Sequence, residues 1–230
     1  MSVYALIAIR PEPGLSATLA RAERMGVQVT GWPLFAVRPL PWDVPDAADY
    51  DGLLLGSANA VRHSGEGLRA LAGLPAFCVG EETAKAARDG GLTVAEAGRG
   101  NLQDLLDKMA GKPLRLLRLT GQMHAPLTPP ADITVTARLV YTVDTLPVPA
   151  ALARQLREGA VVLLHSGVAA AHFASECDRL DLARARIGLA ALAPRVAENA
   201  GTGWACVEAA EVPDDAALLA AAARMCKGWT

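Results

Sequence analysis

The sequence predicts an α/β fold of two similar lobes, each with a parallel sheet flanked by helices, joined by a two-stranded antiparallel ladder. Short apolar runs alternate with alanine-rich amphipathic stretches along most of the chain, a pattern typical of parallel sheets covered on both faces. Part of this pattern occurs twice. Two proline-rich segments interrupt it and indicate where the chain crosses between the lobes.

Composition narrows the class of protein further. The 230 residues are 52% hydrophobic and 20% charged, which excludes a disordered chain. Lys and Arg number 22 against 24 Asp and Glu, without a basic cluster, so nucleic-acid binding is not expected. No apolar run approaches the roughly 18 residues of a membrane span. The first apolar run follows no basic residues and predicts a strand, not a signal peptide, so we expect a cytoplasmic protein.

The individual elements follow from periodicity and from the residues that end them. Gly26 is placed to end the first helix, and the pair Gly90-Gly91 to end a later one. The expected strands are Val3–Ile9, Val27–Trp32, Gly52–Leu55, Ala76–Val79, Leu114–Leu119, Ala160–Leu164, Ile187–Leu192 and Trp204–Val207. The expected helices are Leu15–Met25, Ala58–Arg69, Glu81–Asp89, Asn101–Met109 and Ala216–Met225, with further alanine-rich helices between the late strands.

An internal repeat decides the architecture. The strand-to-helix segment around Ser57 recurs 109 positions later around Ser166. The next such segment, around Thr83, recurs 113 positions later around Val196. Two similar spacings indicate one duplication with a small insertion, and hence two similar lobes.

The two segments that break the alternation set the domain boundaries. Thr30–Pro41 and Ala137–Pro149 are too rich in proline for central strands, and we expect them to pair as an antiparallel ribbon. One domain then comprises residues 1–36 and 146–230, and the other comprises residues 37–145. Strand carboxyl ends and helix amino ends of both lobes would face the cleft between them, which is the expected ligand site.

Several short elements, taken in order, resemble the uroporphyrinogen-III synthase family over essentially the whole chain. They are Ile9-Arg10-Pro11, Ser57–Val61, Val79-Gly80 with Thr83-Ala84, Val140-Tyr141 with Val143, and the weaker second copies His165-Ser166 and Pro194–Ala197. The resemblance implies a cofactor-free lyase that cyclises and dehydrates hydroxymethylbilane to uroporphyrinogen III. The last pyrrole ring is inverted through a spiro intermediate.

The resemblance also implies a set of site residues. Tyr141 matches the family tyrosine and is the candidate general acid for departure of the substrate hydroxyl; packing of the ladder is its alternative role. Backbone N–H groups at helix starts suit the substrate carboxylates. The expected substrate-binding residues are Arg10, Ser57, Ala58, Thr83, Gly121, Ser166, Arg195 and Val196. For the hydroxyl residues helix capping is the alternative, and for the two arginines solvent exposure.

The second copy departs from the family pattern. Val196 stands where the family often has threonine, and Ala193 where it often has glycine, which puts the contacts of that lobe in question. Two alternatives therefore stay open: a catalytically inactive regulatory module of the same fold that binds a tetrapyrrole or small anion, and a two-lobed small-molecule receptor.

Cofactors and partners complete the expectations. The four histidines lack metal-ligand spacing, and no glycine-rich nucleotide motif follows a strand, so neither metal nor cofactor is expected. The four cysteines are far apart and predict free thiols. We expect a monomer that binds the linear tetrapyrrole and transiently contacts the deaminase that supplies it, with neither nucleic acid nor membrane as a partner.

Overall fold

Two units make up the chain in the computed structural model, which describes residues 4–228. Contacts between Cα atoms assign Met1–Ala36 and Thr145–Thr230 to unit 1, and Val37–Asp144 to unit 2. These boundaries lie one residue from those expected from the sequence. Val3, which the sequence places in the first strand, lies outside the described residues. Among the described residues no helix is long and apolar enough to cross a membrane.

Unit 1 is built on a five-stranded parallel sheet in the order β11-β10-β9-β1-β2. Its strands are β1 (Ala5–Ala8), β2 (Val29–Gly31), β9 (Ala160–Leu164), β10 (Ile187–Ala191) and β11 (Cys206–Ala209). Its helices are α1 (Gly14–Arg24), α6 (Ala150–Glu158), α7 (Gly167–Arg179), the 3-10 turn η2 (Arg184–Arg186), α8 (Pro194–Glu198) and α9 (Asp215–Gly228).

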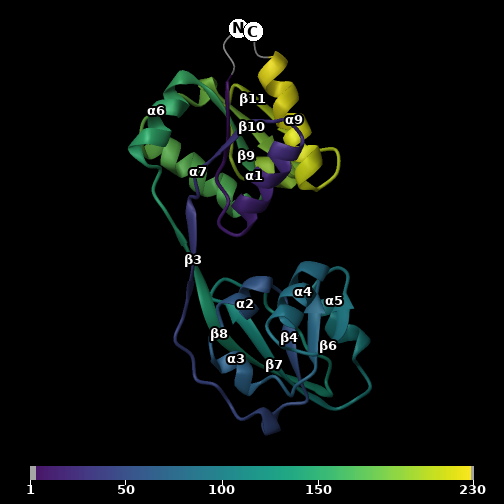
Figure 1. Cartoon of the computed structure of the whole chain (residues 1–230). Helices are drawn as coiled ribbons and strands as arrows, with labels where there is room; N and C mark the ends of the chain where they lie inside the picture. The colour runs from purple at the N-terminus through teal and green to yellow at the C-terminus, as the bar shows by residue number, and fades with distance from the viewer. Residues whose placement is uncertain (1–3, 229–230) are drawn as a thin grey trace. The chain divides into compact units, whose positions relative to one another are not determined.

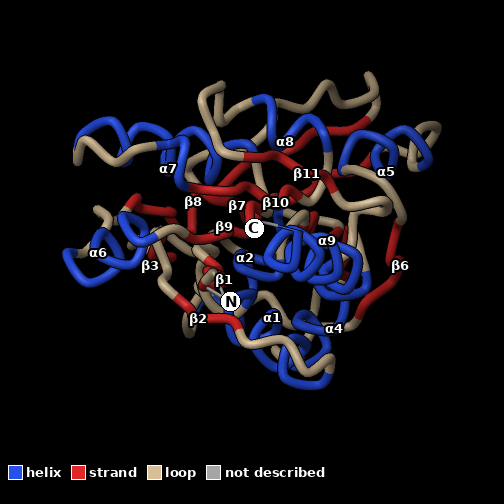
Figure 2. The backbone as a smooth tube through the Cα atoms, turned by 90° about the horizontal axis from the view of Figure 1, so that it is seen from above, coloured by secondary structure: helices blue, strands red, loops and turns tan. Residues whose placement is uncertain are grey.

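Helices cover both faces of this sheet, as continuous apolar strands require. α6, α7 and α8 pack on one face through a core that contains Leu152, Phe173 and Val196. α1 and α9 pack on the other face through a core that contains Leu15 and Leu218. Figures 1 and 2 show α1 and α9 together on one side of the strands, with α7 on the other.

Unit 2 contains a six-stranded sheet in the order β3-β8-β7-β4-β5-β6, parallel from β8 to β6. Its strands are β3 (Phe35–Pro39), which starts in unit 1, β4 (Gly52–Leu55), β5 (Ala76–Val79), β6 (Val94–Gly98), β7 (Leu114–Gly121) and β8 (Ile133–Thr145), which ends in unit 1. Its helices are the 3-10 turn η1 (Ala47–Asp49), α2 (Ala58–Arg62), α3 (Gly67–Ala70), α4 (Glu81–Asp89) and α5 (Leu102–Lys108).

The two faces of the unit 2 sheet are covered differently. α2, α3 and α4 cover one face through a large core that contains Leu53, Leu71 and Leu117. α5 covers the other through a smaller core that includes Leu105 and Leu116. The connection from β7 to β8, residues 122–132, contains no helix and passes over this second face. One face is thus covered by helices alone and the other by one short helix and a loop.

The internal repeat corresponds to equivalent strands. The order β6-β5-β4-β7-β8 in unit 2 matches β11-β10-β9-β1-β2 in unit 1. Ser57 begins α2 after β4 and Ser166 begins α7 after β9, and each side chain accepts a hydrogen bond from its own helix. α5 corresponds to α9, and the helix-free loop corresponds to α1. The predicted duplication therefore describes the arrangement of both sheets.

β3 and β8 run side by side as the predicted ladder. Leu40 N–H donates to Val140 O at 2.9 Å, and Leu146 N–H donates to Leu34 O at 2.8 Å. The partner number falls as the residue number rises, so the two strands are antiparallel. Arg38 on β3 forms an ion pair with Asp144 on β8. Prolines lie at the ends of these segments, not in the hydrogen-bonded middle.

The structure corrects several element predictions. The expected helix Ala58–Arg69 is two short helices, because the chain turns between them at Gly65 with φ of +60°. The strand expected at Trp204–Val207 begins at Cys206. β6 and α6 were not predicted at all. β6 has low apolar content, and α6 follows directly on the proline-rich segment.

Candidate functional site

A cavity of about 390 Å³ lies at the carboxyl edge of the unit 2 sheet. Its wall comes from the ends of β4, β5, β7 and β8, the start of α5, and the loop from Met123 to Leu127. The carboxyl ends of parallel strands are the usual ligand edge of such a sheet. Ser57 and Tyr141, two of the residues expected from the sequence, both line it.

Tyr141 stands on β8, level with the last residue of β7. Gly121 is its strand partner, and a Cβ at Gly121 would lie 2.5 Å from Cζ of the tyrosine ring. His63 flanks the ring on another side, with centroids 6.2 Å apart. Within residues 4–228 the phenol oxygen has no hydrogen-bond partner, so it is free to bind a ligand in the cavity. The glycine therefore makes room for the tyrosine ring.

Arg118, on β7, is the charged side chain of this cavity. It is 6% exposed, and its guanidinium donates one hydrogen bond, from Nη1 to Ala125 O at 3.0 Å. Its Nε is buried without any hydrogen-bond partner. Burial lowers the pKa of Arg118, and the electrostatic interaction with Tyr141 opposes this effect. The sequence analysis did not include Arg118 among its site residues.

The other predicted residues of unit 2 belong to two helix starts. Ser57 Oγ accepts a hydrogen bond from Asn59 N–H at 3.2 Å, which leaves its hydroxyl proton available to a ligand. Ala58 is buried in the first turn of α2. Thr83 is buried in the first turn of α4, which follows Gly80 with φ of +78°. Thr83 is not part of the cavity wall.

The corresponding edge of unit 1 carries a network of paired charges. Asp215, at the start of α9, accepts hydrogen bonds from Thr18 Oγ1 at 2.7 Å and from Arg10 Nη1 at 3.4 Å. His165 Nε2 lies 2.8 Å from the same carboxylate. Burial alone would raise the pKa of Asp215, but the bonds from His165 and Thr18 and the charges of His165 and Arg10 lower it to about 2. Arg10, expected to bind substrate, is therefore already paired.

The remaining predicted residues of unit 1 lie at two helix starts. Ser166 Oγ accepts a hydrogen bond from Ala169 N–H at 3.2 Å and so caps α7. Arg195 is exposed on α8. Val196 is buried in the core under α7 and α8, so its side chain packs inward. Of these three, Arg195 and the hydroxyl of Ser166 are the side chains able to meet a ligand.

Metal ligation and thiol chemistry find no support in the described part of the chain. No group of three or more His, Cys, Asp or Glu side chains there is placed to hold a metal ion. Cys78 and Cys177 are free and buried. Burial raises the pKa of Cys78 to about 11 and that of Cys177 to about 12, so both are poor nucleophiles near neutral pH.

Comparison with known proteins identifies the family. The family profile described as uroporphyrinogen-III synthase HemD matches residues 16–220. The chain belongs to the uroporphyrinogen-III synthase family. A comparison with curated proteins gives no match.

Solved structures of similar fold carry the same description. A uroporphyrinogen-III synthetase from Helicobacter pylori is similar at a TM-score of 0.65 and 14% identity, covering 96% of this chain and 99% of that one. A mutant uroporphyrinogen III synthase from Thermus thermophilus is similar at a TM-score of 0.54 and 18% identity, covering 97% and 99%. At these identities the two structures support the fold, which is the α/β arrangement expected from the sequence.

Uroporphyrinogen-III synthases act on a tetrapyrrole that carries many carboxylates, and this chemistry gives the unit 2 cavity its meaning. The structure brings Ser57, Tyr141 and Arg118 to one cavity. Sequence reasoning missed Arg118, although a signal existed: along β7 it interrupts the apolar alternation set by Leu114 and Leu116. The close approach of Gly121 to Tyr141 also has no signature in the sequence.

Replacing Gly121 by alanine is expected to lower synthase turnover about 10- to 100-fold, since displacing a catalytic group by about 1 Å has effects of this size. The new Cβ forces the Tyr141 ring out of its place. Gly73→Ala is the matched control, because a Cβ at Gly73 meets nothing within 4 Å. Initial rates of uroporphyrinogen III formation measure the effect. Parent-like rates in Gly121→Ala would show that the ring position is unimportant.

Proposed function

We propose that this chain converts hydroxymethylbilane to uroporphyrinogen III, with Tyr141 as the group that assists loss of the substrate hydroxyl. The observation that carries the assignment of Tyr141 is its unpartnered hydroxyl, among the described residues, in a cavity at the carboxyl edge of a parallel sheet. Membership of the family supplies the reaction.

The reaction begins at the hydroxymethyl carbon. Its C–O bond breaks, the hydroxyl departs as water with a proton donated by the Tyr141 phenol, and a cationic azafulvenium group remains. The substituted carbon of the last ring attacks this group to form the spiro intermediate. A C–C bond of the spiro centre then breaks, and the inverted ring closes at its other position. Loss of a ring proton returns the proton to the protein, so the net change is the loss of one water.

Selectivity in this reaction depends on how the chain ends are held. Spontaneous closure gives the non-inverted isomer, so the protein must keep one ring carbon within reach and the other out of reach. The acetate and propionate groups of the substrate are the natural handles. The Ser57 and Ser166 hydroxyls, the exposed Arg195 and the first N–H groups of α4 and α7 are suited to bind them.

Other predicted residues have reduced roles in this proposal. Ala58, Gly121 and Val196 contribute through the backbone, since two of their side chains are buried and glycine has none. Thr83 acts by holding the start of α4. Arg10 supports the edge of unit 1 through Asp215. A monomeric state, a cytoplasmic location and a transient contact with the deaminase are part of the same proposal.

A coupled assay tests the proposed reaction. Porphobilinogen and its deaminase generate hydroxymethylbilane in place, the protein is added, and the oxidised porphyrin isomers are separated. We expect predominantly the type III isomer. Type I alone, from folded protein, would overturn the proposal and favour a binding module of the same fold.

A further inference from the structure

The Arg118 side chain occupies a position that its strand reserves for apolar residues. On β7, Leu114, Leu116 and Arg118 alternate on the face that α5 covers, and Leu116 is fully buried there. A charged side chain in this row has to leave water and therefore needs a partner. Its strand neighbours in register are Leu54 on β4 and Ala137 on β8, and neither offers one.

The duplicated unit shows what this position holds when only packing is required. Arg118 is in register with Leu54 of β4, and Ala8 of β1 is in register with Leu163 of β9. Leu54 and Leu163 are equivalent in the repeat, so Ala8 is the counterpart of Arg118. Ala8 is fully buried in the core beneath α1 and α9. The arginine is therefore an addition of unit 2 that the fold itself does not require.

The surroundings of Arg118 leave its charge uncompensated. Among the described residues that line the cavity there is no aspartate or glutamate. In unit 1 the corresponding edge is filled by α1 and by Asp215, whose carboxylate pairs with Arg10. In unit 2 a helix-free loop replaces α1, and the space remains open as the cavity. A buried guanidinium with an unpaired Nε in an open cavity is arranged to receive an anion.

We propose that the unit 2 cavity binds one carboxylate of the tetrapyrrole, with the Arg118 guanidinium as its counter-ion. Nε supplies an unused N–H donor, and the Thr120 and Ser57 hydroxyls stand in or beside the same wall. Tyr141 lines the same cavity, so a carboxylate held there fixes the adjoining pyrrole next to the phenol. Arg118 is thus a substrate-binding residue, and the identity of its ligand rests on the proposed function.

The test compares Arg118→Met with the parent protein in two assays. KM for hydroxymethylbilane is expected to rise about 10- to 100-fold, the range for one charge-assisted contact, while kcat changes little. The Kd for uroporphyrin III, a stable porphyrin with eight carboxylates, is measured by quenching of tryptophan fluorescence and is expected to rise similarly. Arg118→Lys keeps the charge without the planar fork and is expected to lie between the two.

The thermal unfolding midpoint without ligand separates binding from structure. Arg118→Met removes a buried unpaired cation at similar volume, so its midpoint is expected to equal or exceed that of the parent. Ala125 O, which loses its donor, is in an exposed residue and is hydrated instead. A marked fall in the midpoint of both Arg118 variants would overturn the proposal, because Arg118 would then be a structural residue.

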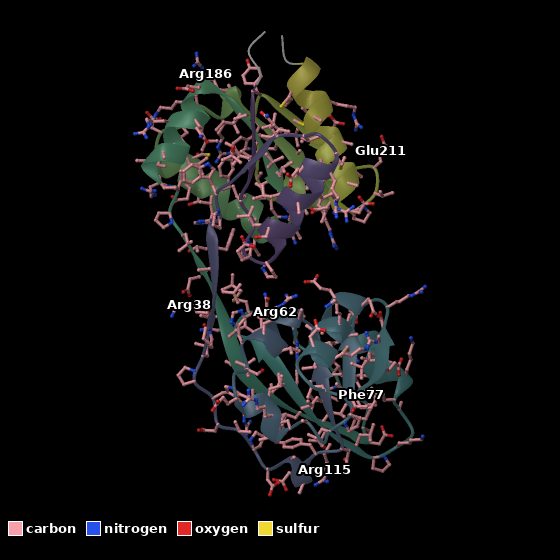
Figure 3. The ribbon with its side chains drawn as sticks, viewed as in Figure 1. Arg38, Arg62, Phe77, Arg115, Arg186 and Glu211 are labelled. Atoms are coloured by element: carbon pink, nitrogen blue, oxygen red, sulfur yellow. The ribbon has the colours of Figure 1, made fainter. Side chains whose placement is uncertain are left out.

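A matched control and the remaining outcomes complete the test. Arg115 lies on the same strand, exposed and paired with Asp51, and Figure 3 shows it at the opposite end of unit 2 from Arg62. Arg115→Met is expected to leave KM and Kd unchanged. Type III product with unchanged KM and Kd in Arg118→Met would overturn the Arg118 site alone. Absence of type III product with Arg118-dependent uroporphyrin binding would overturn the proposed function and leave the site standing.

Discussion

Tyr141→Phe is expected to lower kcat for uroporphyrinogen III formation about 100-fold, the lower end for loss of a general acid, with KM little changed. The substitution removes the phenol proton that accompanies the leaving hydroxyl and preserves the ring beside Gly121. Because the hydroxyl has no hydrogen-bond partner among residues 4–228, its loss leaves no buried group unsatisfied. The free energy of unfolding should therefore stay within about 0.5 kcal/mol of the parent value.

The slower variant also gives a second readout. Hydroxymethylbilane closes spontaneously to the type I isomer, so slower enzymatic turnover raises the share of type I in the product. Tyr50→Phe is the control, because Tyr50 packs against the same core but precedes β4, at the amino end of the strands. Equal kcat in Tyr141→Phe and the parent would assign Tyr141 to packing of the ladder alone.

Asp215→Ala is expected to destabilise the protein by about 3 kcal/mol, the lower end for breaking a buried charge pair. Asp215 is the shared acceptor of Arg10, Thr18 and His165, and its removal leaves all three without that acceptor. It also removes a negative charge from the first turn of α9, where the helix dipole favours one. Urea unfolding measures the change.

The Asp215 effect has a defined pH dependence. The carboxyl pKa is lowered from 3.8 to about 2 in the folded protein, so the stability it contributes is complete above its ordinary pKa and is lost as pH falls through about 2. The difference between parent and Asp215→Ala should therefore shrink between about pH 4 and pH 2. Glu211→Ala, at an exposed position, is the control and should be near neutral. A constant difference across this pH range would contradict the assigned role of the carboxylate.

Local sequence patterns were sufficient for much of the fold. Gly52–Leu55, Ala76–Val79 and Ala160–Leu164 have the bounds expected from the sequence, because each is a short apolar run with clear breakers at its ends. The repeat located equivalent strands in both units, since related sequences form related strand-to-helix turns. Family resemblance then pointed to Tyr141, which lies at the cavity.

The rest depended on contacts between distant parts of the chain. Arg10 and Asp215 are 205 positions apart, so no local pattern could show that the arginine is paired. The absence of a carboxylate beside Arg118, among the described residues, becomes visible only when the neighbouring strands and the loop are in place. Likewise, the reason for Gly121 lies in a ring on another strand. These are tertiary facts that residue spacing does not encode.

The division of unit 1 between two stretches of sequence has a consequence for biosynthesis. β1 lies inside its sheet, between β2 and β9, yet β9 leaves the ribosome only after the whole of unit 2 has been made. Unit 2 is continuous from Val37 to Asp144 and has all its strands except the beginning of β3 and the end of β8 within that stretch. During translation the N-terminal segment must therefore wait with one face and one edge uncovered. A nascent chain stalled after unit 2 exposes the apolar β1, and chaperone binding should concentrate there until the last third of the chain arrives.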